Sequence, residues 1–359
     1  MDYSSISIKA ALHVYSKIIM SASQFVAMLV VAHFMGPTPL GMIGYATGVI
    51  GIFSLVANLG FSTTHRKKIA EGKDLGECIG TYFTIRMVLM TIWVSLFLVW
   101  IFNVQYMGNL GFSKEQEYVL YLVALHKILM GHSGIIRHTF WSNLEAAKSV
   151  LPKLSSRVLV SFLKIIVAVS GMGVVMLAFT QVIGAILLMM VYIYMFRNYP
   201  FKFPSRNFVK DYVKFTIPLM LTIPFTVLAS SSSSVMIGSF WGVEEVAFFT
   251  VPLTLTKAIA LTSGTIGLIL LPLISKKSES KDWKSVHILV HESERFIHIY
   301  MLPITMLVII FSKEIVSLLL GPSFSSSANV LSILIFYSFI DLTTRPYSTQ
   351  LISTGHVNL

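Results

Sequence analysis

The sequence predicts an all-α integral membrane protein with about ten transmembrane helices in two pseudo-repeated lobes. Of its 359 residues, 55% are hydrophobic and 12% are charged, whereas soluble domains carry about 25% charged residues. Its apolar stretches are continuous and reach the roughly 20 residues that a helix needs to cross a bilayer. Single-chain β-barrels use shorter strands in which apolar and polar residues alternate, so these stretches favour helices.

Six predicted helices make up the first lobe, residues 1–200. The first two form a hairpin around the turn 35–41, whose prolines and glycines stop one helix and start the next. A basic loop, His65–Lys68, and a polar stretch, Glu145–Lys153, separate later helices. We expect the six helices at about 9–34, from the turn to 61, 77–103, 116–142, 153–171 and 174–196.

The second lobe, residues 201–359, contains four predicted helices and follows a loop rich in Lys and Arg. We expect these helices at about 212–240, 244–274, 289–312 and 325–352.

The loop charges predict the orientation of the chain. If the N-terminus is cytoplasmic, the loops after the second, fourth, sixth and eighth helices lie inside, and they hold most of the Lys and Arg residues outside the helices. The positive-inside rule therefore explains the net charge of +11 without a nucleic-acid partner. The stretch from Ile18 to Thr64 has no Lys, Arg, Asp or Glu and is too long for a cleaved signal peptide. We expect a multi-pass protein of the cytoplasmic membrane.

An internal repeat gives the first indication of function. Residues 27–47 and 233–253 each contain an apolar run, a glycine at the outer turn (Gly36 or Gly242) and a second helix start. The two hairpins lie six helices apart in the same orientation. Parallel repeats of this kind build two-lobed transporters with the substrate site between the lobes. The alternative is that two membrane hairpins resemble each other by chance.

Four glycines fall roughly on one face of the second predicted helix. They are Gly41, Gly44, Gly48 and Gly51. Small residues permit two helices to pack closely, which is the favoured interpretation. The alternative is a smooth wall for a moving helix or lipid tail.

Several segments resemble polysaccharide flippases of the Wzx type. They are Tyr212–Leu221, Ile237–Gly242 and Leu271–Lys276 in the second half, Gly36–Thr63 in the first half, and Leu351–His356 after the tenth helix. These flippases belong to the multidrug/oligosaccharidyl-lipid/polysaccharide (MOP) exporter superfamily, so the resemblance implies a MATE-like fold. It also implies flipping of a polyisoprenyl-(pyro)phosphate-linked oligosaccharide by alternating access.

The chain departs from the family pattern in two respects. The family has twelve or more helices in two six-helix lobes, so the resemblance implies that the second lobe of this chain, with four predicted helices, is incomplete and the chain truncated. Ser230–Ser234 stand where the family usually has an Asp-Arg pair late in the seventh helix. A non-functional fragment of a flippase is therefore one alternative. A second is a cation-coupled multidrug exporter of the same superfamily, which would need buried acids. A third, a membrane glycan polymerase or ligase, would need a larger outside loop than 104–115.

Six cations at membrane depth are the candidate substrate-binding residues. A charge at the bilayer centre costs about 2.5–3.5 kcal/mol on insertion scales, so each needs a reason. The six are Lys17, Arg86, Lys127, Lys164, Lys257 and Arg345. An unpaired cation is tolerated in a water-filled cavity that receives an anion, and the phosphate of a lipid-linked glycan is such an anion.

The alternatives differ among these six residues. Lys127 and Lys257 lie near mid-helix, where a side chain cannot easily reach the membrane surface, so they are the strongest candidates. The cations of the first, third and fifth helices lie nearer to a membrane face and can snorkel. Asp341, the only acid at comparable depth, stands four residues before Arg345, so an intrahelical ion pair is also expected there.

We expect no catalytic residues, no metal and no cofactor. The sequence has no P-loop or other nucleotide motif, and His126, His132 and His138 share no helix face that would hold a metal. Its one cysteine, Cys78, excludes an intrachain disulfide. The expected partners are a lipid-linked glycan substrate, membrane lipids and glycan-assembly enzymes, with no nucleic acid, and the expected state is a monomer.

Overall fold

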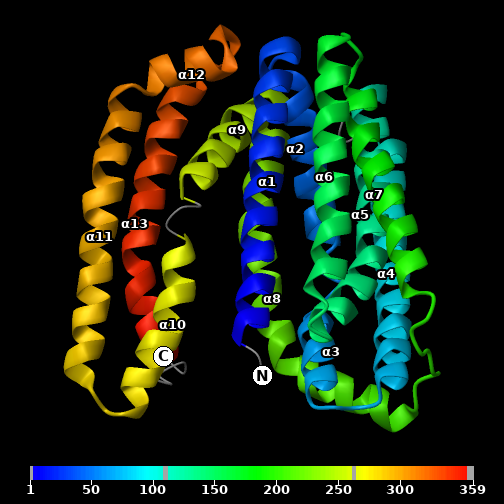
Figure 1. The fold of residues 1–359 in the computed structure, drawn as a ribbon. Coiled ribbons are helices and arrows are strands. Elements are labelled where there is room, and N and C mark those ends of the chain that lie inside the picture. The colour runs from blue at the N-terminus through cyan, green and yellow to red at the C-terminus, as the bar shows by residue number, and fades with distance from the viewer. Residues whose placement is uncertain (1–2, 108–111, 261–263, 354–359) are drawn as a thin grey trace. The chain divides into compact units, whose positions relative to one another are not determined.

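The computed structural model describes residues 3–107, 112–260 and 264–353, and every regular element in these ranges is a helix. The elements (Figure 1) are α1 Tyr3–Met35, α2 Pro37–Phe53, α3 Phe61–Ala70, α4 Leu75–Met107, α5 Lys114–Ser142, α6 Ala146–Val169, α7 Val174–Phe196, α8 Arg206–Phe240, α9 Val243–Ala260, α10 Gly264–Glu279, α11 Trp283–Ile310, α12 Ser312–Leu320, the 3₁₀ turn η1 Pro322–Phe324 and α13 Ser327–Ser353. The predicted all-α class is confirmed.

Six of the described helices are long and apolar enough to cross a membrane by length and composition. Their spans are Ala11–Met35, Leu75–Val104, Lys114–Ser142, Val174–Phe196, Trp283–Ile310 and Ser327–Leu351. α2 and the second part of α8, Val227–Phe240, are apolar but shorter. α6 has the length of a span but carries four cations, which sets it apart from the six. The chain is a multi-pass membrane protein.

The second predicted helix is broken in two. α2 ends at Phe53, residues 54–60 form turns, and α3 begins at Phe61. The prediction of a loop at His65–Lys68 is therefore wrong, because these residues belong to α3. Arg and Lys are good helix formers, so a basic tetrapeptide does not by itself end a helix.

Other boundaries also differ from the predicted ones. α6 begins at Ala146, so Pro152 lies inside this helix and does not start it. α12 was not predicted, because its nine residues follow directly on α11. The predicted helix 244–274 corresponds to α9 and α10, and its residues 261–263 lie outside the described residues. Residues 354–356, the end of the family-like segment Leu351–His356, also lie outside the described residues.

The chain divides into two compact units, unit 1 (Met1–Ala247) and unit 2 (Phe248–Leu359). Unit 1 contains α1 to α8 and the start of α9, because α8 packs on α2 and α3. This division follows contacts and falls later than the lobe boundary predicted at residue 200 from the repeat. In unit 2, α13 packs against α10 and α11, and Phe248 of α9 contacts Phe324 of η1 edge to face.

Unit 1 has two distinct ends (Figure 1). The α1–α2, α6–α7 and α8–α9 turns lie at one end, which we call the hairpin end. α3 and the connection 197–205 between α7 and α8 lie at the other end, which we call the basic end. The N-terminal end of α1 also points to the basic end.

Both repeated hairpins turn at a glycine in the left-handed region, where a side chain would be strained. Gly36 has φ 73° and Gly242 has φ 98°. α2 packs tightly on α8 and the start of α9 along its length. Near the turns a Cβ on Gly41 would lie 1.8 Å from the Val243 carbonyl oxygen, and toward the other end of α2 one on Gly51 would lie 2.4 Å from Ser231 Oγ. The packing interpretation of the α2 glycines is thereby confirmed at these positions.

The connection 197–205 is fixed to the start of α4 at the basic end. The Lys202 backbone N–H donates to the Gly76 carbonyl at 3.1 Å, and Lys202 Nζ donates to Asp74 Oδ2 at 2.8 Å. Ser205 Oγ donates to Glu77 Oε1 at 2.6 Å. A Cβ on Gly80 would lie 1.8 Å from the Lys202 carbonyl oxygen. This close contact sets where α8 begins.

Candidate functional site

The cations of α6 share one face of that helix. Lys153, Arg157 and Lys164 follow at intervals of four and seven residues, which places them within about 40° of one another around a helix of 3.6 residues per turn. All three side chains are half-buried. No Asp or Glu occurs between residues 146 and 210, so neither α6 nor α7 supplies a counter-ion.

α1 and α5 bring further cations to this face of α6. Ser161 Oγ of α6 lies 3.4 Å from Ser23 Oγ of α1. The ring centroids of His13 in α1 and Trp141 in α5 lie 4.9 Å apart. We call the resulting set the cationic surface: Lys17 of α1, Arg137 of α5, and Lys153, Arg157 and Lys164 of α6, with His13 and His126 beside them.

The charges of the cationic surface are close enough to repel one another. Lys153 experiences the charges of Arg137 and Arg157, and Lys164 experiences that of Arg157. No Asp or Glu occurs at 3–70 or 118–144, and no cation of the surface has an ion-pair partner among the described residues. Half-buried cations without an acid partner are compensated by a bound anion or by water. The arrangement suits a phosphate, which accepts charge-assisted hydrogen bonds.

Two of the six predicted residues, Lys17 and Lys164, lie on the cationic surface. Lys127 is on α5 with an exposed side chain, and the cation that acts on it is Arg86 of α4. Lys257 is on α9, in unit 2, and its side chain is exposed. The structure thus brings together only part of the predicted set.

Arg345 of α13, also in unit 2, is engaged by an acid on its own helix. Its Nη2 lies 2.8 Å from Asp341 Oδ2, and its Nε donates to the same oxygen at 3.2 Å. The ion pair expected from the i,i+4 spacing is therefore present. Arg345 offers less to an anion than the unpaired cations of unit 1.

Arg86 of α4 is engaged by backbone. Its side chain is 6% exposed; Nη1 donates to the Ala57 carbonyl, and Nη2 donates to the Gly131 carbonyl at 3.1 Å. Both of its terminal nitrogens thus donate within the protein, while Nε is buried without a hydrogen-bond partner among the described residues. This placement favours a structural role over contact with a substrate.

The sequence analysis missed Arg137, Lys153 and Arg157. Lys153 lies where the predicted polar stretch Glu145–Lys153 meets the predicted helix 153–171, whereas α6 begins at Ala146 and contains it. The i,i+4 spacing of Lys153 and Arg157, continued at Lys164, is the signal that could have revealed a cationic helix face.

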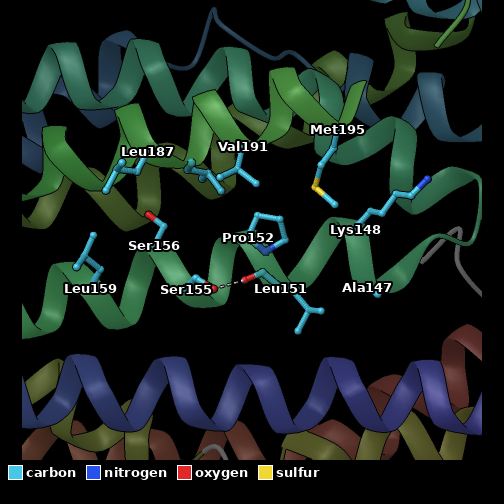
Figure 2. A pocket seen from close by; sticks show the side chains of 11 residues that line it. Ala147, Lys148, Leu151, Pro152, Ser155, Ser156, Leu159, Leu187, Val191 and Met195 are labelled. Atoms are coloured by element: carbon cyan, nitrogen blue, oxygen red, sulfur yellow. Dashed lines mark hydrogen bonds between the residues drawn. The ribbon is translucent and has the colours of Figure 1, made fainter. Parts of the chain in front are cut away.

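The face of α6 toward α7 is apolar. A groove of about 540 Å³ lies between the two helices, and Figure 2 shows Pro152 and Ser156 of α6 facing Leu187 and Val191 of α7 across it. Beyond the groove the helices meet closely, because Ser156 Oγ donates to the Gly184 carbonyl at 2.7 Å. α6 therefore separates an apolar groove from the cationic surface.

Comparison with solved structures identifies the fold. The chain is similar to the lipid II flippase MurJ in an inward closed conformation, with TM-score 0.69 and 14% identity, covering 97% of this chain and 78% of that one. It is similar to a multidrug resistance MATE family transporter of the MOP superfamily in an inward-facing conformation, with TM-score 0.67 and 16% identity, covering 94% and 82%. A Vibrio cholerae MATE transporter, VcmN in the bent form, gives TM-score 0.52 and 15% identity, covering 98% and 86%. The predicted MATE-like fold is confirmed.

Sequence comparison gives the family. Comparison with curated protein sequences finds no match. The model of a family described as "Polysaccharide biosynthesis protein" matches residues 30–329, which is most of the chain. This protein therefore belongs to the polysaccharide biosynthesis protein family, and it has the fold shared by MATE transporters and MurJ in the MOP superfamily.

Proposed function

We propose that this protein flips a polyisoprenyl-(pyro)phosphate-linked oligosaccharide across the cytoplasmic membrane. The observation that carries the proposal is the cationic surface, which gathers five cations from α1, α5 and α6 without an ion-pair partner among the described residues. A phosphate or pyrophosphate would neutralise these charges, and arginine binds it with two parallel hydrogen bonds. Membership of the polysaccharide biosynthesis family and the similarity to MurJ support this class of substrate.

Movement of the substrate is proposed to follow alternating access between lobes 1–200 and 201–359. We propose ten membrane crossings with the N-terminus in the cytoplasm, so that the hairpin end faces outward. At that end α2 of the first lobe packs on α8 of the second, and Thr38 Oγ1 donates to Glu244. This contact would close the outer side while the cationic surface receives the headgroup from the cytoplasm.

The second candidate function is cation-coupled multidrug export, which the similarity to MATE transporters favours. Such an exporter binds cations and needs acids in its membrane interior. The helices of the cationic surface place no Asp or Glu there. The charge of unit 1 therefore supports an anionic substrate.

We propose that the protein acts as a monomer, performs no covalent chemistry, and works among membrane lipids and glycan-assembly enzymes.

Complementation tests the proposal. A strain blocked in the translocation of a lipid-linked glycan would receive the native chain, the variant Arg157→Gln/Lys164→Gln, and the control Lys284→Gln, which removes an exposed cation of α11. We expect rescue by the native chain and the control, and little or none by the double variant at equal expression. Failure of the well-expressed native chain would contradict the proposed function.

The earlier candidates Lys127 and Lys257 are tested in the same strain with Lys127→Ala and Lys257→Ala. If they contact the headgroup, each substitution weakens rescue. Undiminished rescue by both would remove them from the site without affecting the cationic surface.

A further inference from the structure

The break between α2 and α3 exposes backbone groups inside the protein. Residues 54–60 are not helical, and the chain passes through the left-handed region at Leu59 (φ 43°) and Gly60 (φ 92°). A helix end leaves carbonyl groups without helical partners, and in a membrane other protein groups must satisfy them. The break lies in the long stretch without Lys, Arg, Asp or Glu that ends at Thr64.

Arg86 supplies donors at this break. Its guanidinium joins three elements, because it belongs to α4 and donates to Ala57 in the break and to Gly131 in α5. No acid accompanies it within hydrogen-bond reach among the described residues. A buried cation held only by neutral carbonyls is costly, so its position needs a reason beyond general stability.

The surroundings are shaped for this contact. A Cβ on Gly131 would lie 2.6 Å from Met90 Cε and 3.4 Å from Arg86 Nη2. The absence of a side chain at residue 131 therefore lets α4 approach the α5 backbone closely. Arg86 reaches both carbonyls from this position.

The direction of α2 depends on the break, because α2 runs from the break to the hairpin end. There Gly41 of α2 packs on Val243 at the start of α9, while Gly51, close to the break, packs on Ser231 of α8. We propose that Arg86 is a positioning residue that fixes the break and thereby holds α2 against α8 at the hairpin end. This role goes beyond binding of a substrate and does not depend on which substrate is carried.

A cysteine pair at the hairpin end tests the proposal. Cys78, the only cysteine, is replaced in Cys78→Ala, and Thr38→Cys and Glu244→Cys are added where the native side chains bond to each other. Cross-linking by a short bifunctional thiol reagent is measured in membranes. With Arg86 present we expect rapid cross-linking. Arg86→Met should slow it about tenfold, as the loss of charge-assisted hydrogen bonds predicts.

Two comparisons separate positioning from substrate binding. Arg86→Gln lacks the charge, like Arg86→Met, but keeps N–H donors, so it should retain more cross-linking than Arg86→Met. Lys127→Met removes the neighbouring cation and should leave cross-linking unchanged. The readout uses no substrate, so failure of the proposed flippase activity would not affect it.

Three results would overturn the proposal. The first is cross-linking of the Arg86→Met variant at the same rate as with Arg86 present, whether or not complementation is lost. The second is equal slowing in Arg86→Gln and Arg86→Met, which would assign the effect to charge. The third is failure of Arg86→Gln to accumulate as a folded protein, which would make Arg86 a requirement for folding.

Discussion

Arg86 and Arg157 carry the same charge within unit 1 but have different surroundings. The Arg86 guanidinium is buried and donates to two backbone carbonyls. The Arg157 side chain is half-buried, and its guanidinium has no hydrogen-bond partner among the described residues. From the sequence, each arginine can be judged only by its position along a predicted helix, and this position does not distinguish Arg86 from Arg157. The distinction depends on whether a neighbouring backbone presents free carbonyls, which requires the fold.

A pH dependence follows from the ion pair at the basic end. The hydrogen bond from Lys202 lowers the pKa of Asp74 below its ordinary value of 3.8, and Asp74 in turn raises the pKa of Lys202 above 10.5. The stabilisation from Asp74 is therefore present above pH 3.8 and is lost as the pH falls through the lowered value. That from Lys202 is present below pH 10.5 and is lost as the pH rises through the raised value.

We expect Asp74→Asn to lower the thermal unfolding midpoint slightly at pH 7, because both groups of the pair are exposed and salt screens them. The difference from the native protein should shrink as the pH falls through the lowered pKa of Asp74, because the native carboxyl then takes up a proton. Lys202→Gln should give the same pattern. A difference that stays constant throughout an acid titration would show that the ion pair is not its cause.

At the scale of elements, continuous apolar stretches predict most of the helices because burial in lipid requires them. The predicted 77–103, 116–142 and 174–196 lie within α4, α5 and α7. The break after Phe53 and the early start of α6 could not be predicted in this way. Apolar residues continue through the break, and the Arg86 side chain that donates to Ala57 there lies 29 residues further along the chain. Pro152 is accommodated inside α6, although proline more often marks a helix start.

The close packing of α2 predicts a position-specific effect of glycine substitution. Gly41→Ala would place its Cβ 1.8 Å from the Val243 carbonyl oxygen, whereas nothing lies within 4 Å of a Cβ on Gly134 in α5. We expect Gly41→Ala to destabilise the protein by about 1–3 kcal/mol through overpacking. Gly134→Ala, the matched control, should be neutral or slightly stabilising because alanine favours helix. Unfolding in denaturing detergent measures both. Equal stability of the two variants would contradict the packing of α2 described above.

At the scale of the whole molecule, the sequence repeat and the packing contacts divide the chain at different places. The two hairpins are offset by six helices, whereas the contacts divide the chain into units 1 and 2. The repeat relates α1–α2 to α8–α9, and both pairs turn at a left-handed glycine. Packing nevertheless places α8 in unit 1 with α2. In the proposed mechanism, this contact is expected when the hairpin end is closed, because the first hairpins of the two lobes meet there. We base the proposed class of substrate on the charge pattern, because five cations without an ion-pair partner among the described residues favour an anion.

Translocation in proteoliposomes tests the central claim most directly. The purified protein is reconstituted with a fluorescent polyisoprenyl-pyrophosphate-linked oligosaccharide, and the fraction that reaches the opposite leaflet is followed over time. We predict translocation by the native protein and at least about tenfold slower translocation by Arg157→Gln/Lys164→Gln, as expected for the loss of charge-assisted hydrogen bonds. Native rates in this variant, with both proteins equally folded and reconstituted, would contradict the claim that the cationic surface carries the headgroup.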